Sequence, residues 1–105
     1  MRHKPVIPRA LAGQDVDEAI AYYLSQNAES AALGLIDALE QAYAHIGRHP
    51  ASGSTRYADV LELPGLRSWP LKRYPHIVFY IEQQAHIDVW RVLHGGSDIP
   101  IWLHT

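Results

Sequence analysis

Apolar residues in the first half of the chain recur with the period of an α-helix. Two stripes follow the spacing i, i+3, i+4, i+7, and a short polar segment separates them. The first stripe consists of Val16, Ala19, Ile20, Tyr23 and Leu24, and the second of Ala32, Leu35, Ile36, Leu39, Tyr43 and Ile46. This spacing predicts two amphipathic helices. The short connection predicts that they form an antiparallel helical hairpin.

Polar residues at the ends of the two stripes predict where the helices begin and end. Asp15 and Glu18 are expected in the first turns of the first helix, where carboxylates interact favourably with the helix dipole. Asn27 is predicted to be the N-cap of the second helix. Pro50 is expected to end that helix after Arg48, whose positive charge suits a helix C-terminus.

The hydrophobic period changes in the second half of the chain. Residues 51–59 are rich in small and polar side chains and predict a loop. Three later segments have the length and the β-branched or aromatic content of strands. They are residues 66–73, 76–82 and 87–94. The polar residues 83–86 predict a hairpin connection, so that at least the last two strands pair antiparallel.

Prolines and apolar runs indicate the place of each strand in the sheet. Residues 77–81 are apolar on both faces, which is typical of a central strand. Pro70 predicts an edge or a kink, and two prolines confine residues 4–8 to a short edge strand. The predicted order is β-α-α-β-β-β. It defines an α+β fold in which an N-terminal strand and a helical hairpin pack on a small antiparallel sheet.

Length and composition limit the kinds of protein that the chain can be. Its 105 residues predict one domain over residues 1–105, and 48% apolar with 19% charged residues is typical of a globular protein. The absence of cysteine excludes disulfides, zinc thiolates and a cysteine nucleophile. No apolar run reaches the about 18–20 residues of a membrane span, and no signal-peptide core is present. A cytoplasmic protein without a membrane partner is therefore expected.

The charges are segregated along the chain although the net charge is only −2. Residues 10–47 contain six carboxylates and no Lys or Arg, whereas residues 66–76 contain three cations and no carboxylate. A protein that grips phosphate backbones usually has a clear excess of Lys and Arg. The small negative net charge therefore argues against strong non-specific binding of nucleic acid. Residues 66–76 form a locally basic segment.

Seven histidines raise the question of a metal site. His45 and His49 are four residues apart and fit two ligands on one helix face. No third ligand follows at a diagnostic spacing, and their place at a helix C-terminus is explained by the dipole. Glycine-rich phosphate loops are also absent. The sequence therefore predicts neither a metal ion nor a cofactor.

Four stretches of the sequence resemble ParE-type toxins of the RelE/ParE superfamily. Residues 15–23 (DVDEAIAYY) are similar to the signature of the first helix, and residues 49–54 contain the His-Pro-x-x-Gly turn after the second. Residues 63–70 (LPGLRSWP) resemble the entry to the central sheet. Residues 89–95 followed by 98–100 resemble the last strand and the tail. The order and spacing agree over nearly the whole chain.

This resemblance implies the toxin of a type II toxin–antitoxin module, of the kind called plasmid-stabilisation proteins. Such toxins are neutralised by a small antitoxin, here a cognate ParD-like protein, whose disordered C-terminal segment folds along the toxin surface. A homodimer or a hetero-oligomer with the antitoxin is compatible with this reading. The implied target is DNA gyrase in the ParE branch and mRNA on the ribosome in the RelE branch. The shared fold leaves the two targets open.

The alternative is a metal-independent endoribonuclease, which needs cations for the phosphate and an acid or base for the ribose. In this sheet Arg67, Lys72, Arg73 and Arg91 could supply the cations, and His94 or His76 the acid or base. The resemblance to the RelE branch would assign the catalytic roles to Arg67, Arg91 and His94. Strand alternation, however, predicts Arg91 and Leu93 on one face and His94 on the other. No catalytic residue is therefore expected under the preferred reading, in which the protein is a gyrase-binding toxin and not an enzyme.

We expect residues 67–73 and 91–99 to carry the activity. Including one C-terminal aromatic anchor, the predicted target or partner residues are Arg67, Trp69, Lys72, Arg73, Arg91, His94, Asp98 and Trp102. Trp90, in the middle of a strand, is expected in the core instead. Ser97 stands where the family often has Arg before the tail Asp-Ile. This difference keeps a third reading open, an inactive toxin-like binding module.

Overall fold

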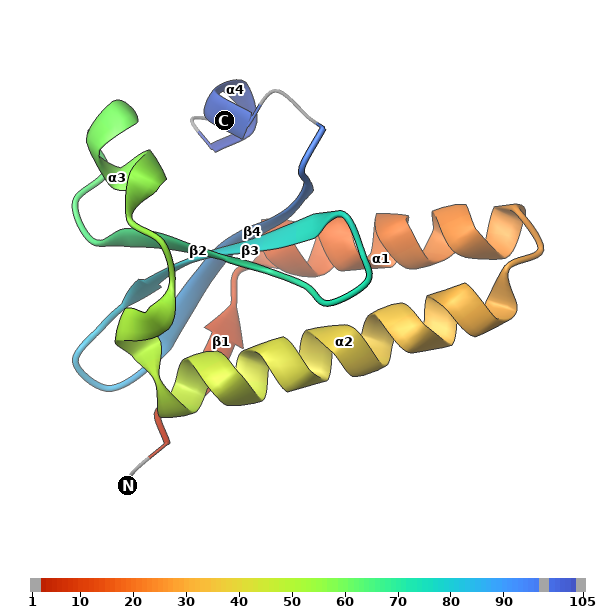
Figure 1. Ribbon diagram of the computed structural model, residues 1–105, viewed down its shortest axis with the longest axis horizontal. Coiled ribbons are helices and arrows are strands. Elements are labelled where there is room, and N and C mark those ends of the chain that lie inside the picture. Colours follow the sequence, from red (N-terminus) through yellow and green to blue (C-terminus); the bar gives the residue numbers. More distant parts are fainter. Residues whose placement is uncertain (1–2, 97–98, 104–105) are drawn as a thin grey trace.

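The computed structural model describes residues 3–96 and 99–103. Within these ranges the predicted α+β fold and its β-α-α-β-β-β order are confirmed, with three short helical segments added (Figure 1). The principal elements are β1 (Val6–Pro8), α1 (Ala10–Ser25), α2 (Glu29–Arg48), β2 (Leu66–Pro70), β3 (His76–Glu82) and β4 (Ile87–His94). The added segments are the 3-10 turn η1 (Pro50–Ser52), α3 (Arg56–Val60) and α4 (Ile99–Leu103).

The four strands form one sheet in the order β1-β4-β3-β2. β3 is central, and β1 and β2 lie at the edges, as the apolar run and the prolines predict. The pairs β2–β3 and β3–β4 are antiparallel, whereas β1 pairs with β4 in parallel. A parallel pair needs a long connection between its strands, and most of the chain, including the helical hairpin, separates β1 from β4.

Helices cover both faces of the sheet. α1 and α2 lie on one side, and α3 and α4 lie on the other (Figure 1). Two apolar clusters fill these layers. The cluster under α1 and α2 is formed by Ala12, Leu35, Ala42, Ile46, Leu71, Val78, Tyr80, Ile87, Val89 and Val92. The cluster under α3 and α4 is formed by Leu61, Leu66, Phe79, Leu93, Ile99 and Leu103.

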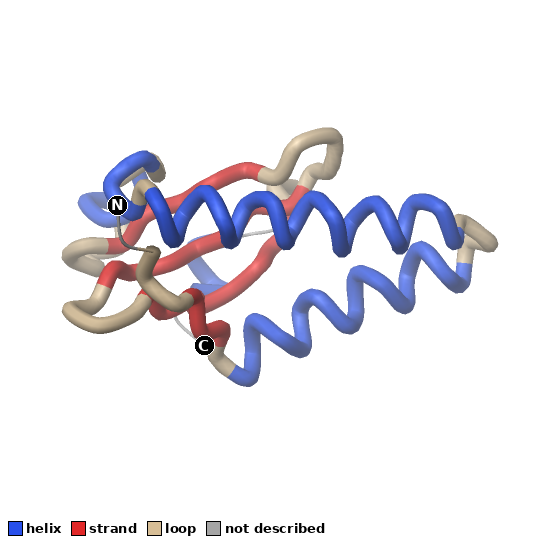
Figure 2. Tube along the Cα trace, turned by 90° about the horizontal axis from the view of Figure 1, so that it is seen from below, coloured by secondary structure: helices blue, strands red, loops and turns tan. Residues whose placement is uncertain are grey.

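The two long helices form the predicted antiparallel hairpin, which extends beyond the strands (Figure 2). α1 begins at Ala10, six residues before the first residue of its apolar stripe, because Arg9 continues directly from β1 and donates its N–H to the carbonyl oxygen of Val89. Asp15 is therefore in the second turn of α1 and not in its first. This correction places its carboxylate against the sheet.

Asn27 ends the first helix instead of capping the second. Its φ angle of 56° is in the left-handed region, and the N–H of Ala28 is bonded to the carbonyl oxygen of Tyr23 at 2.9 Å. Asn tolerates this conformation better than most residues, and it is a common way to stop a helix. The N-cap of α2 is Ala28, which has no side-chain hydrogen bond.

Two further segments differ from the sequence prediction. Residues 51–59, predicted as a loop, contain most of η1 and the first part of α3. α3 buries Leu61 and packs Tyr57 against Phe79, with 5.2 Å between the ring centroids. The first predicted C-terminal strand stops at Pro70, so that Lys72 and Arg73 lie in the β2–β3 loop.

A β-bulge at Trp90 interrupts the alternation of β4. Phe79 pairs with Arg91 and Tyr80 pairs with Val89, which leaves Trp90 without a partner on β3. Trp90 was expected in the core, but it is half-buried outside both apolar clusters, with the Arg9 guanidinium 4.3 Å from the centre of its ring. A bulge gives no signal in the apolar pattern, so alternation alone misplaced this side chain.

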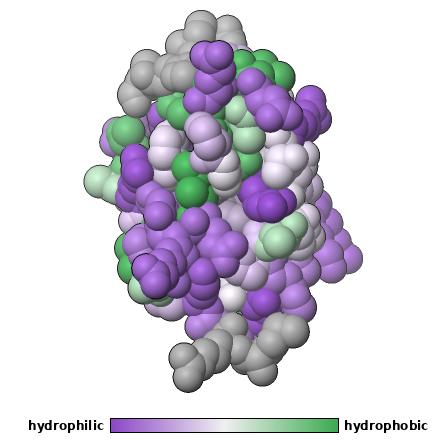
Figure 3. Space-filling model, turned by 90° about the vertical axis from the view of Figure 1, so that its left-hand side faces the viewer, coloured by the Kyte–Doolittle hydropathy of each residue, from purple (hydrophilic) through white to green (hydrophobic). Residues whose placement is uncertain are grey.

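The surface is mixed in character. At the end of the molecule that carries α3 and the β3–β4 connection, hydrophilic residues predominate and hydrophobic residues are exposed between them (Figure 3). Among the described residues, no helix combines the length and the apolar character needed to cross a membrane.

Candidate functional site

The basic segment formed by β2 and the loop after it combines one half-buried cation with two exposed cations. Arg67 is half-buried and donates from Nη1 to the carbonyl oxygens of Ala51 (3.0 Å) and Gly53 (2.8 Å). Lys72 and Arg73 are exposed. Within the described residues neither forms an ion pair. The exposed positive charge of the segment therefore lies on Lys72 and Arg73 in the β2–β3 loop, whereas Arg67 stabilises the turn after α2.

Tyr80 reinforces the same turn from the central strand. Its hydroxyl donates to the carbonyl oxygen of Pro50 at 2.8 Å and accepts the N–H of Gly53 at 3.1 Å. A Cβ atom at Gly53 would collide with this hydroxyl, so the close approach requires glycine here. The glycine of the His-Pro-x-x-Gly turn thus has a packing role.

The exposed loop is fixed to the helical hairpin by one side chain. Tyr74 donates its hydroxyl to the carbonyl oxygen of Ala31 at 2.7 Å, and its ring packs edge-on against Tyr23 with centroids 5.9 Å apart. Gly34 leaves the room for this contact, because a Cβ there would meet the Tyr74 hydroxyl. Lys72 and Arg73 therefore project from an anchored loop.

Trp69 lies against α2 and forms a pocket with it. Its ring stacks on His45 with centroids 4.2 Å apart and an angle of 19° between the planes. The pocket has a volume of about 320 Å³ and is lined by Ala38, Gln41, Ala42, Ala44, His45, Arg48, Trp69 and Lys72. Trp69 is partly buried and also packs against the apolar cluster under α1 and α2, so it contributes to the core as well as to the pocket.

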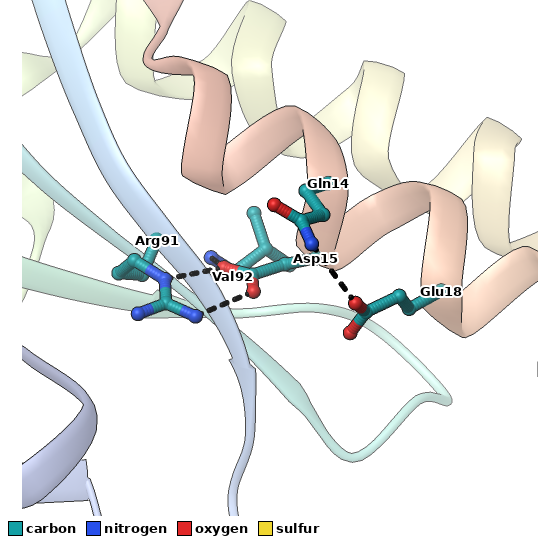
Figure 4. A network of polar contacts seen from close by, with 5 residues as sticks. All are labelled: Gln14, Asp15, Glu18, Arg91 and Val92. Carbon is teal, nitrogen blue, oxygen red and sulfur yellow. Dashed lines mark hydrogen bonds and ion pairs between the residues drawn. The ribbon is translucent and has the colours of Figure 1, made fainter. Parts of the chain in front are cut away.

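A buried ion pair joins α1 to β4 (Figure 4). Arg91 donates to both carboxylate oxygens of Asp15, at 2.8 and 2.7 Å, and each side chain is 9% exposed. The same carboxylate accepts the N–H of Val92 at 3.0 Å. These hydrogen bonds raise the pKa of Arg91, although burial acts in the opposite direction. Asp15 thus binds the part of β4 that extends past its pairing with β1.

Two histidines lie next to this ion pair. The rings of His76 and His94 are 5.7 Å apart, and His94 accepts the N–H of Gly96 at its Nδ1. His94 is exposed, whereas His76 is only 8% exposed and its Nδ1 has no hydrogen-bond partner among the described residues. Burial, with a smaller contribution from His94, lowers the pKa of His76. His76 is therefore kept neutral more strongly than an exposed histidine.

Arg91 and His94 line one pocket of about 240 Å³ together with Asp15, Glu18 and His76. Arg91 and His94 lie on opposite faces of β4, as alternation predicts, but the long Arg91 side chain reaches Asp15 past the end of the β1–β4 pairing, so that both residues line the pocket. Arg67 does not line this pocket, however. Arg91 is bound by Asp15, and Arg67 is bound to carbonyl oxygens beyond the central strand β3.

Two of the predicted contact residues fall outside what the structure describes. Asp98 and its neighbour Ser97 lie in the gap between the described ranges, and Trp102 belongs to α4 without a described side chain. No group of three metal-ligating side chains gathers among residues 3–96 and 99–103. The rings of His45 and His49 are 5.2 Å apart.

Sequence reasoning missed four residues that shape these sites. Asp15 was assigned to a helix end, and its partner lies 76 positions away. Tyr80 was taken as part of a strand, His76 was weighed only as an acid or base of the alternative ribonuclease, and His45 as a metal ligand or a residue of a helix C-terminus. Only Asp15 had a usable signal, because it lies four residues before Ala19 and so faces the same side of the helix as this member of the stripe.

The fold, a helical hairpin on a small four-stranded sheet, is that of the small toxins of toxin–antitoxin modules. Residues 6–99 match the family described as the ParE toxin of the type II toxin–antitoxin system parDE. The chain belongs to this family. A solved structure with the same fold, that of the chromosomal ParDE TA system from P. aeruginosa, has 18% sequence identity and a TM-score of 0.72, covering 88% of this chain and 96% of the other. No curated protein sequence matches the chain.

Proposed function

We propose that this ParE-family toxin inhibits DNA gyrase by binding it, and that it acts in the cytoplasm. The observation that carries the proposal is the family match, which extends over residues 6–99. On this reading the toxin holds gyrase on cut DNA and so blocks replication. It does so without bond-breaking chemistry of its own.

The dispersal of the candidate catalytic residues supports a binding toxin over a ribonuclease. Arg91 neutralises a buried carboxylate, and Arg67 fixes a turn through two carbonyl oxygens. Of the three groups that the RelE branch would use, only His94 is exposed. Phosphate charge in a transition state needs cations aimed at it, and these two guanidinium groups are already engaged.

We assign the target contact to the exposed side chains of the basic segment and of the last strand. Lys72 and Arg73 project from the anchored β2–β3 loop, and His94 is exposed at the end of β4. The other three predicted residues have positioning roles: Arg67 binds the turn after α2, Trp69 stacks on His45, and Arg91 binds Asp15. Asp98 and Trp102 complete the proposed contact in the tail.

The helical hairpin offers a surface for the ParD-like antitoxin. Its exposed large apolar side chains are Leu11, Tyr22, Leu24, Leu33 and Ile36. Tyr22 is 60% exposed. An amphipathic segment of the antitoxin would bury these side chains. The toxin and its antitoxin would then form a hetero-oligomer.

Two assays on the purified protein test the proposal. In the first, supercoiled plasmid is incubated with gyrase and toxin, and trapped double-strand breaks are measured as linear DNA. In the second, translating ribosomes are incubated with toxin, and the mRNA ends are mapped. We expect linear plasmid that requires gyrase, with intact mRNA. Cut mRNA with unaffected gyrase would assign the protein to the RelE type of activity, and no effect in either assay would indicate an inactive binding module.

A further inference from the structure

The pocket between α2 and Trp69 has a composition that the fold alone does not require. Three of its lining residues, His45, Arg48 and Lys72, are cationic or titratable, and none is a carboxylate. The remaining lining is formed by Gln41, the Trp69 ring and three alanines. Among the described residues, neither Arg48 nor Lys72 has an ion-pair partner. The pocket therefore combines cationic side chains that form no ion pair within the described part of the chain with an apolar floor.

Helix-end electrostatics explains only part of this charge. Arg48 is the last residue of α2, where a cation favours the helix dipole. Lys72 comes from the β2–β3 loop and has no such reason to face α2. Arg48 and Lys72, with His49, help to lower the pKa of His45, after the larger effect of burial. The cations from two separate elements thus act on one imidazole.

The aromatic side of the pocket is preorganised. His45 stacks on Trp69 and is hydrogen-bonded from Nε2 to the Ser52 hydroxyl at 3.0 Å. That hydroxyl donates its own proton to the carbonyl oxygen of His49 at 2.7 Å, so its oxygen accepts from His45. A platform that is already fixed loses little conformational entropy when it is covered. Trp and Arg are also frequent anchors of protein interfaces.

The same features favour a peptide over nucleic acid. A nucleic-acid strand needs a row of cations along its backbone, but Asp37 and Glu40 lie on α2 beside the pocket and the net charge of the chain is −2. An apolar side chain fits over the alanines and the indole ring. A carboxylate next to it then meets Arg48 and Lys72.

We propose that this pocket, formed by α2, Trp69 and Lys72, binds a partner peptide that carries an apolar side chain flanked by carboxylates. The apolar side chain covers Ala38, Ala42 and the Trp69 ring, and the carboxylates pair with Arg48 and Lys72. Binding of such a peptide in this pocket does not depend on whether the toxin attacks gyrase.

The test uses the full chain and a short capped peptide composed of Leu and Glu. Binding is followed by NMR through the indole N–H of Trp69 and the amides of Ala38 and Ala42. We expect saturable shifts of these signals with the Leu/Glu peptide. The Gln counterpart of the peptide is expected to cause none, because it lacks the carboxylates.

Matched charge variants locate the contact. Arg48→Gln is expected to weaken binding about five-fold, which is the upper range for one exposed ion pair. Arg56→Gln removes the same charge from α3, outside the pocket, and is expected to leave the affinity unchanged. Equal effects of the two variants, shifts away from the pocket, or equal binding of the Gln peptide would overturn the proposal. Tighter binding of a single-stranded oligonucleotide at the same signals would also overturn it, in favour of nucleic acid.

Discussion

At the scale of single residues, Asp15 illustrates why burial decides the role of a charge. Its carboxylate is bonded to the Arg91 guanidinium and to the N–H of Val92, and it joins α1 to the end of β4. The other carboxylates of the acidic first half, such as Asp17, are exposed. A composition count treats them alike, but within the described part of the chain only Asp15 among these carboxylates binds a buried side chain.

We expect Asp15→Ala to lower the free energy of unfolding by about 3 kcal/mol, because it removes the carboxylate that accepts two hydrogen bonds from a buried guanidinium and one from the N–H of Val92. Asp17→Ala, on the exposed side of the same helix, is the control and is expected to change it by less than about 0.5 kcal/mol. Urea unfolding of the two variants measures the difference. Equal midpoints would show that the Arg91 guanidinium finds water or another partner.

His76 is expected to make stability depend on pH. In the folded protein its pKa lies below the ordinary value of 6.5, because of burial and the nearby His94. Tyr23 of α1 also packs against the His76 ring, with 6.4 Å between the two ring centroids. As the pH falls below about 6.5, the unfolded chain therefore binds more protons than the folded one, and stability decreases.

His76→Leu is expected to reduce this dependence between about pH 7 and pH 5. Part of it will remain, because the pKa of His45 is lowered as well. His3→Leu, near the N-terminus and exposed, serves as the control and should keep the slope of the wild type. Chemical unfolding at several pH values measures the slope. An unchanged slope in His76→Leu would mean that other groups cause the loss of stability in acid.

At the scale of elements, the turn after α2 and the β2–β3 loop divide the basic segment into two roles. Arg67 and Tyr80 bind the carbonyl oxygens and the N–H of residues 50–53, whereas Lys72 and Arg73 are exposed. The sequence shows one basic segment and cannot distinguish these roles. They differ because a half-buried guanidinium must satisfy its donors within the protein.

Arg67→Gln is expected to destabilise the protein by about 2 kcal/mol, since hydrogen bonds from a charged group to two carbonyl oxygens are lost. Arg73→Gln is expected to change stability by less than about 0.5 kcal/mol, because its side chain is exposed. Thermal unfolding compares the two variants. Faster amide exchange at Gly53 in Arg67→Gln alone would confirm that the effect is local to the turn. Equal stabilities would contradict the assigned role of Arg67.

The secondary-structure elements differ in how well the sequence predicts them. The stripe of α2 and the doubly apolar β3 have strong periodic signals, and both elements lie where those signals place them. α3 is too short to show a period, and the bulge at Trp90 changes a register without changing composition. Asn27 was misread because the same residue type favours both the start of a helix and the left-handed stop of another.

At the scale of the whole molecule, the fold brings together charges that lie far apart along the chain. The carboxylates of the first half are carried by α1 and α2, and the exposed cations Lys72 and Arg73 of the β2–β3 loop lie beside Asp37 of α2. Sequence therefore predicted the fold and the basic segment. It did not predict the Trp69 pocket, because contacts between distant segments depend on the packing of α2 against β2.

We propose that the exposed β2–β3 loop, and not a catalytic site, carries the toxicity of the whole molecule. The most direct measurement is the gyrase-dependent linearisation of plasmid by the double variant Lys72→Glu/Arg73→Glu, with Arg56→Glu as a charge control on α3. Circular dichroism must first show that the variants are folded. The account predicts that the wild type and Arg56→Glu produce linear DNA and that the double variant loses at least about ten-fold in potency. Full potency of the folded double variant would contradict the account.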